Sequence, residues 1–210
     1  MTPDERRAQL EGAAIDVLRD KGLAATTKEI AEHAGVAEGT IFRVFDTKDD
    51  LVQAALVRAF DPQPLAEHLR AINPEQPLRQ RLLAMVDAQQ QHLTKLFGLM
   101  AAVGMVRPPE SLRHHGHEAH GDAQSHVQGA MVALIEADAD RLRISSHDLL
   151  RLLQMLTFAG SHKHIAHGDL LTPDQIVDVL LDGVLKPTGH QPGGRQQPAT
   201  PTTRTAATSC

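Results

Sequence analysis

Apolar residues recur along the chain at intervals of three and four, which is the spacing of one face of an α-helix. In the first such segment, about 3–21, Leu10, Ala14 and Leu18 share one face. No segment alternates between polar and apolar residues as a half-buried strand does. The pattern therefore predicts an all-α fold. The expected helices lie near 3–21, 26–34, 38–45, 48–60, 65–72, 78–103, 122–137, 147–167 and 173–185.

The segment between Thr26 and Lys48 has strong start and stop signals for short helices. Thr26 and Glu29 have the spacing of a capping box, in which each side chain caps the other residue's backbone N–H. Gly35 ends this helix, and another begins near Glu38. Thr47 can cap the helix that starts at Lys48. Two helices joined by a short turn that contains glycine predict a helix-turn-helix.

This segment, TTKEIAEHAGVAEGTIFRVFDTKDDL over 26–51, closely resembles the DNA-binding domain of the TetR family. The resemblance covers roughly residues 8–55. It implies an N-terminal helix-turn-helix three-helix domain and a C-terminal helical bundle for ligand binding and dimerisation. The in-register matches are Ile30, Ala31, Ala34, Gly35, Val36, Gly39, Thr40, Ile41, Phe42, Phe45, Lys48 and Leu51.

The candidate DNA contacts follow from position as well as from resemblance. Gly39 allows close backbone approach, and free N–H groups at a helix start attract phosphate. Arg43, one turn further on, can reach guanine or phosphate. The helix that begins near Thr27 crosses the DNA backbone in this motif. The expected set is Thr27, Lys28, Glu38, Gly39, Thr40, Phe42, Arg43 and Lys48.

Three positions depart from the family pattern. Ala37 stands where Ser or Thr is usual, and a missing cap costs about 1 kcal/mol of helix stability. Phe42 replaces a usual Tyr, so it offers no hydroxyl to a phosphate. Glu38 suits the helix dipole but repels phosphate. These departures affect individual contacts and leave the motif unchanged.

The expected organisation is a DNA-binding domain over 1–47, an effector-binding and dimerisation domain over 48–186, and a disordered tail over 187–210. The tail prediction rests on its Pro, Gly, Gln and Thr content. The resemblance implies a homodimer that pairs through its last two helices. Such a dimer would bind a pseudo-palindromic double-stranded operator as a repressor and leave it when a small-molecule effector binds.

Methionine lines adaptable pockets, and the resemblance places the effector among the central helices. The candidate pocket residues also suit simple core filling. They are Met85, Phe97, Met100, Met131, Met155 and Phe158.

Charge and composition limit the alternatives. The net charge is −5, and residues 1–50 carry seven basic and eleven acidic side chains, so bulk charge does not favour nucleic acid. A helical enzyme or scaffold without a DNA role is the hypothesis that this acidity supports. We expect no catalytic activity and no cofactor, because no Walker loop and no GxGxxG occur. The single cysteine, Cys210, and the lack of a long apolar run predict a cytoplasmic protein.

Histidines suggest an alternative sensor of metal or pH. The chain has 13 of them, and His164 and His167 are the weak metal candidates because three-residue spacing shares a helix face. His117 and His120 have the same spacing, but they are one residue short of the HExxH pattern. Solvated loop histidines and the polar ends of packed helices are the simpler explanation of both pairs.

Overall fold

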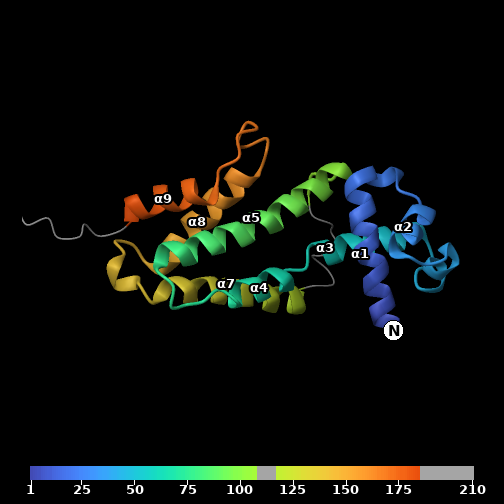
Figure 1. The fold of residues 1–210 in the computed structure, drawn as a ribbon, viewed down its shortest axis with the longest axis horizontal. Helices are drawn as coiled ribbons and strands as arrows, with labels where there is room; N and C mark the ends of the chain where they lie inside the picture. The colour runs from blue at the N-terminus through green and yellow to red at the C-terminus, as the bar shows by residue number, and fades with distance from the viewer. Residues whose placement is uncertain (108–116, 185–210) are drawn as a thin grey trace, which may run out of the picture.

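The computed structural model describes residues 1–107 and 117–184, with side chains for 1–107 and 125–184. Within these ranges every regular element is a helix, which confirms the all-α prediction. Figure 1 shows an elongated molecule, with α1, α2 and α3 at one end and a longer helical body at the other. We call these parts the reader (residues 3–59) and the body (residues 63–184).

Capping signals in the sequence set the limits of the reader helices. Thr2, Thr26 and Thr47 each form a capping box, with Glu5, Glu29 and Asp50 respectively. The reader consists of α1 (Pro3–Lys21), η1 (Gly22–Ala24), α2 (Thr27–Ala34), η2 (Glu38–Arg43) and α3 (Lys48–Ala59).

The reader has its own hydrophobic core. Side chains from α1, α2, η2 and α3 fill it, and the end of α5 adds Leu99 and Val103. Leu10, Leu18 and Ile30 are fully buried there. Because α3 packs on α1, its residues Leu51 and Leu56 belong to this core. The predicted domain boundary at residue 47 stays a prediction.

The body is a second packed unit. Its elements are α4 (Gln63–Arg70), α5 (Leu78–Ala102), α7 (His117–Glu136), η3 (Ala139–Arg141), α8 (Ser146–Ser161) and α9 (Pro173–Val184). Leu82, Met85, Met131, Leu149 and Val177 are fully buried between them.

Ion pairs join distant segments of the body. Arg79 on α5 donates to Asp174 (2.8 Å) and Asp178 (2.9 Å) on α9. Arg81 is only 2% exposed and pairs with Asp138 beyond the end of α7. These contacts fix α5 between α7 and α9.

Three helix limits differ from the sequence prediction. The expected α-helix over 38–45 is the 3₁₀-helix η2, since Thr40 N–H donates to Ala37 O and Ala37 provides no side-chain cap. α7 begins at His117 instead of residue 122. α8 ends at Ser161 instead of residue 167. The tail over 187–210 lies outside the described residues.

Candidate nucleic-acid interface

The turn between α2 and η2 has the geometry that a helix-turn-helix requires. Gly35 is left-handed (φ 69°, ψ 34°), and its N–H donates to the carbonyls of Ala31 and Glu32. Val36 N–H also donates to Ala31 O at 3.0 Å. The positive φ turns the chain sharply enough to bring η2 against α2. The predicted helix–turn–helix therefore forms, with a 3₁₀-helix in the second position.

One face of η2 packs on the core of the reader, and the other face is exposed. Ile41 is fully buried and Phe45 is 3% exposed, so both anchor the element to the core. The guanidinium of Arg7 lies 4.5 Å from the ring centroid of Phe45 and covers it. Phe42 instead is 50% exposed. The Phe42 ring is therefore accessible at the surface of the reader, while Ile41 and Phe45 hold the backbone on either side of it.

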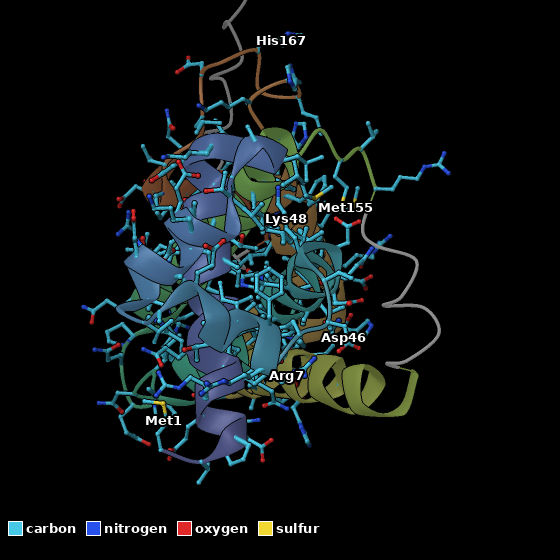
Figure 2. The ribbon with its side chains drawn as sticks, turned by 90° about the vertical axis from the view of Figure 1, so that its right-hand side faces the viewer. Met1, Arg7, Asp46, Lys48, Met155 and His167 are labelled. Atoms are coloured by element: carbon cyan, nitrogen blue, oxygen red, sulfur yellow. The ribbon has the colours of Figure 1, made fainter. Side chains whose placement is uncertain are left out.

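The predicted DNA contacts lie on α2, η2 and the start of α3, at one end of the molecule (Figure 1). Figure 2 faces this end and labels Lys48. Lys28, Gly39, Phe42 and Arg43 are exposed. Lys28 and Arg43 form no ion pair with any residue in the described ranges. Both charges are therefore available to a phosphate.

Other predicted contacts are held by neighbours in the reader. Thr27 Oγ1 donates to Glu38 Oε1 at 2.5 Å, which joins α2 to η2. Lys48 Nζ donates to the carbonyl of Leu23 at 3.0 Å. Thr40 is partly buried. Glu38 and Lys48 thus have structural partners as well as a position near the predicted DNA face.

An ion pair in the reader neutralises Lys21. Lys21 Nζ lies 2.6 Å from Glu29 Oε1. Lys21 and the capping bonds from Thr26 lower the pKa of Glu29 to about 2, and Glu29 raises the pKa of Lys21. The carboxylate stays ionised at neutral pH and neutralises Lys21, so Lys21 adds little to a basic surface.

The predicted effector residues do not form one pocket lining. Met85 and Met131 are fully buried in the body core, whereas Met155 is 61% exposed. Met100 is partly buried on α5. Phe97 and Phe158 meet edge to face, with ring centroids 5.2 Å apart.

A cavity of about 750 Å³ lies beside this aromatic pair, between α4, α5, α7 and α8. We call it the body cavity. Gln89 is 8% exposed, and its Oε1 is buried with no hydrogen-bond partner among the described residues. Gln154 Nε2 donates to Gln128 Oε1 at 3.1 Å and lies 3.5 Å from Met131 Sδ. The lining consists of Leu65, Gln89, His92, Leu93, Ser125, Gln128, Gln154 and Phe158.

Of the six predicted pocket residues, Phe158 is in this lining. The glutamines and His92 in this lining were not among the predicted pocket residues. The sequence signal for these lining residues was a polar side chain on the apolar face of a predicted helix, as at Gln89 and Gln154.

The histidine prediction was wrong in its geometry. α8 ends at Ser161, so His164 and His167 lie in the following loop and share no helix face. His167 has φ 51°, which no helix contains. No group of three or more metal-ligating side chains occurs in the described residues. His114 and His115 lie outside the described residues, and for His117 and His120 only the helical backbone is described.

Comparisons with known proteins agree with this geometry. The sequence model "Bacterial regulatory proteins, tetR family" matches residues 12–55. The chain is 51% identical over 57 residues to the HTH-type transcriptional regulator YvkB of Bacillus subtilis, which covers 27% of this chain and 29% of YvkB. It is 41% identical over 87 residues to the HTH-type transcriptional activator FasR of Mycolicibacterium smegmatis, covering 40% and 39% of the two chains. These alignments span well under half of either relative.

The likeness of the whole fold comes from solved structures. The TetR transcriptional regulator SCO0520 of Streptomyces coelicolor is 27% identical, with a TM-score of 0.55. The match covers 87% of this chain and 99% of that one.

No helix in the described ranges is long and apolar enough to cross a membrane.

Proposed function

We propose that this chain is a regulator of the tetR family, a homodimeric repressor that binds DNA through its helix-turn-helix and is released by a small-molecule effector; the family match over residues 12–55 and the likeness of the whole fold support this. The observation that supports DNA recognition most directly is the exposed surface of η2. Phe42 and Arg43 project from an element that Ile41 anchors in the core. A rigid support with free contact groups is what base recognition needs.

Within this proposal each predicted contact has a distinct part. Arg43 contacts guanine or phosphate, and Phe42 packs on a thymine methyl. Lys28 and Lys48 bind phosphates, and Gly39 lets the backbone approach. Thr27, Glu38 and Thr40 complete the surface, with Glu38 held by the Thr27 hydroxyl.

The exposed apolar side chains of the last two helices support dimerisation through α8 and α9. Met155 on α8 is 61% exposed and Val179 on α9 is 67% exposed. Apolar side chains on neighbouring helices form a surface that a second copy can cover. The two readers of such a dimer would lie about one helical turn of DNA apart.

The body cavity supports effector binding. It combines the apolar Phe158 and Leu93 with glutamine amides. Gln89 Oε1 is a buried acceptor without a donor among the described residues, which a ligand hydroxyl or amide N–H would satisfy. We therefore propose an effector that is largely apolar and carries at least one hydrogen-bond donor.

A regulator of this kind acts where the chromosome lies, so cytoplasmic location is part of the proposal. No catalytic role is proposed. Metal sensing is not proposed, because His164 and His167 do not share a helix face.

The DNA proposal is tested by a gel-shift titration of the full chain on the DNA upstream of its own gene, and by selection from a random-sequence pool. Arg43→Ala should weaken specific binding by about 1–3 kcal/mol per reader. It should also lower the dependence on salt, because each phosphate contact released changes the slope by about 0.9.

Arg70→Ala is the matched control, because Arg70 is an exposed arginine on α4, away from the reader. Equal loss in both variants would show that overall charge, and not η2, binds the DNA. No binding to any sequence in the pool would overturn the proposal. Activation in place of repression in a reporter assay would overturn only the sign of regulation.

Dimerisation is tested by light scattering during gel filtration. Val179→Glu should convert the dimer into a monomer, because it places a charge within the proposed interface. Val106→Glu is the control at another exposed valine. A wild-type monomer, or a Val179→Glu dimer, would contradict the assigned surface.

A further inference from the structure

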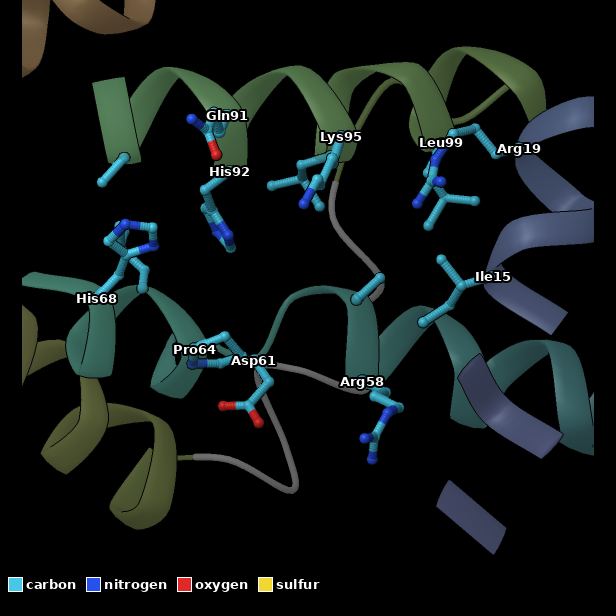
Figure 3. Close-up of a pocket in the computed structure, with 14 residues that line it drawn as sticks. Ile15, Arg19, Arg58, Asp61, Pro64, His68, Gln91, His92, Lys95 and Leu99 are labelled. Atoms are coloured by element: carbon cyan, nitrogen blue, oxygen red, sulfur yellow. The ribbon is translucent and has the colours of Figure 1, made fainter. Parts of the chain in front are cut away.

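A second cavity, of about 240 Å³, lies where the reader meets the body (Figure 3). We call it the junction cavity. α1 contributes Ile15 and Arg19, and α3 contributes Arg58. α4 and α5 form the opposite wall. The further lining residues are Ala59, Asp61, Pro64, Leu65, His68, Ala88, Gln91, His92, Lys95, Leu96 and Leu99.

The side chains that face this space carry nitrogen donors. Figure 3 shows the imidazoles of His68 and His92 pointing toward one another from α4 and α5, and Lys95 directed into the same space. Asp61 is the single acidic side chain among the lining residues described, and its carboxylate is turned to the opposite side. The described lining therefore sets one acidic side chain against several nitrogen-bearing ones.

Only some of the positively charged side chains around the cavity have an acidic partner. Arg58 lies 3.6 Å from Glu11, and Arg19 lies 3.2 Å from Asp16. Arg19 Nε, however, is buried and has no acceptor in the described part of the chain. Lys95 forms no ion pair with any described residue. One free ammonium and one unsatisfied guanidinium N–H thus border the same cavity.

From this arrangement we propose that the junction cavity binds a small anion through carboxylate or phosphate oxygens. Lys95 supplies the charge, while His68, His92 and Arg19 donate hydrogen bonds. The bound anion would connect α1 of the reader with α4 and α5 of the body. Anion binding would therefore change operator affinity, a consequence that rests on the proposed function.

The half-buried imidazole of His92 couples anion binding to proton uptake. Burial, and then the neighbouring Lys95, lower the pKa of His92, with Asp61 acting in the opposite direction. His68 on α4, Arg19 on α1 and Arg58 on α3 also line the cavity. The neutral form of the His92 imidazole is therefore favoured when the cavity is empty. An anion would raise the pKa of His92, so binding would take up a proton and tighten as pH falls.

The site is tested by titrating the full chain with inorganic phosphate and, separately, with succinate. Carbon-13 spectra of labelled histidine side chains report binding, and His68→Gln and His92→Gln assign the signals. Succinamide, which has the shape of succinate without its charge, is the ligand control. We expect saturable shifts of His68 and His92 with at least one anion and none with succinamide; which anion binds identifies the carboxylate or phosphate class.

Lys95→Gln should weaken that binding about tenfold, since it removes one charge-assisted hydrogen bond. Lys163→Gln, at an exposed lysine outside the lining, should leave it unchanged. Absence of saturation with both anions, equal binding of succinamide, or unchanged affinity in Lys95→Gln would overturn the site.

Operator affinity measured with and without the saturating anion tests the coupling separately. A saturable site without any change in operator affinity would overturn the coupling and leave the anion site. A saturable site in a protein that binds no DNA would overturn the proposed function alone.

Discussion

Replacement of Gly22 by alanine should be among the most damaging single changes at the junction of reader and body. Gly22 is buried at the end of α1, with φ 60° and ψ −149°. Residues with a Cβ rarely adopt this backbone conformation. A Cβ at Gly22 would also lie 2.3 Å from the carbonyl oxygen of Ala102, the last residue of α5. Either the chain at Gly22 or the end of α5 must move.

The magnitude follows from these two costs. The backbone conformation costs on the order of 1–3 kcal/mol for a residue other than glycine. Overpacking against a fixed neighbour adds roughly 1–3 kcal/mol. The free energy of unfolding should therefore fall by about 2–6 kcal/mol, a large share of the roughly 5–15 kcal/mol of an ordinary domain.

Alanine variants at two other glycines distinguish the cost of the backbone conformation from the cost of overpacking. Gly35 has φ 69° but open space around its Cβ position, so Gly35→Ala should lose only about 1–2 kcal/mol. Gly12 lies within α1 without positive φ and with no atom within 4 Å, so Gly12→Ala should gain about 0.5–1 kcal/mol.

Urea unfolding followed by circular dichroism, at one protein concentration, measures all three variants. The expected order of stability is Gly12→Ala, wild type, Gly35→Ala, Gly22→Ala. A Gly22→Ala protein as stable as Gly35→Ala would refute the contact with Ala102, because the backbone cost alone would then account for the loss.

Three further changes test individual contacts. Phe42→Ala should weaken operator binding in a gel shift with the melting temperature nearly unchanged, because the ring is 50% exposed; a large loss of stability would contradict this. Asp138→Asn should cost about 3–5 kcal/mol in urea unfolding, since it leaves the buried Arg81 unpaired, and Arg81→Met should cost less. Because the pKa of Glu29 is about 2 in the folded protein, against 4.5 ordinarily, its contribution is present above pH 4.5 and is lost as pH falls toward 2. Melting temperatures across that range should fall less steeply in Glu29→Gln, and identical slopes would exclude the Lys21 contact as the cause.

The reader could be predicted from sequence because its signals are local. The Thr26–Glu29 capping box and the left-handed Gly35 set the ends of α2 through interactions within a few residues. The end of α8 could not be predicted in this way. Leu171 N–H donates to Gly160 O at 3.1 Å, and the Leu171 side chain occupies the space that a Cβ on Gly160 would take. This contact joins the last turn of α8 to the loop that follows it, and the apolar pattern along α8 does not reveal it.

The cavities were harder to predict for a related reason. Helical spacing indicates that a side chain faces the core but not which helix it meets. Met131 and Met155 both lie on central helices, yet one is fully buried and the other is 61% exposed. Gln89 and His92 line the body cavity because α5 has α4, α7 and α8 around it. Such an arrangement depends on the assembled bundle.

The position of α5 connects the two cavities to the reader. Leu82 and Met85, near its start, belong to the body core, whereas Leu99, near its end, belongs to the reader core. Leu65 and His92 line both cavities, so a ligand in either one contacts the same wall. A ligand that displaced α5 would also shift the Ala102 carbonyl, which lies close to Gly22 of the reader. By thermodynamic linkage, operator binding must then change ligand affinity by the same factor as the ligand changes operator affinity.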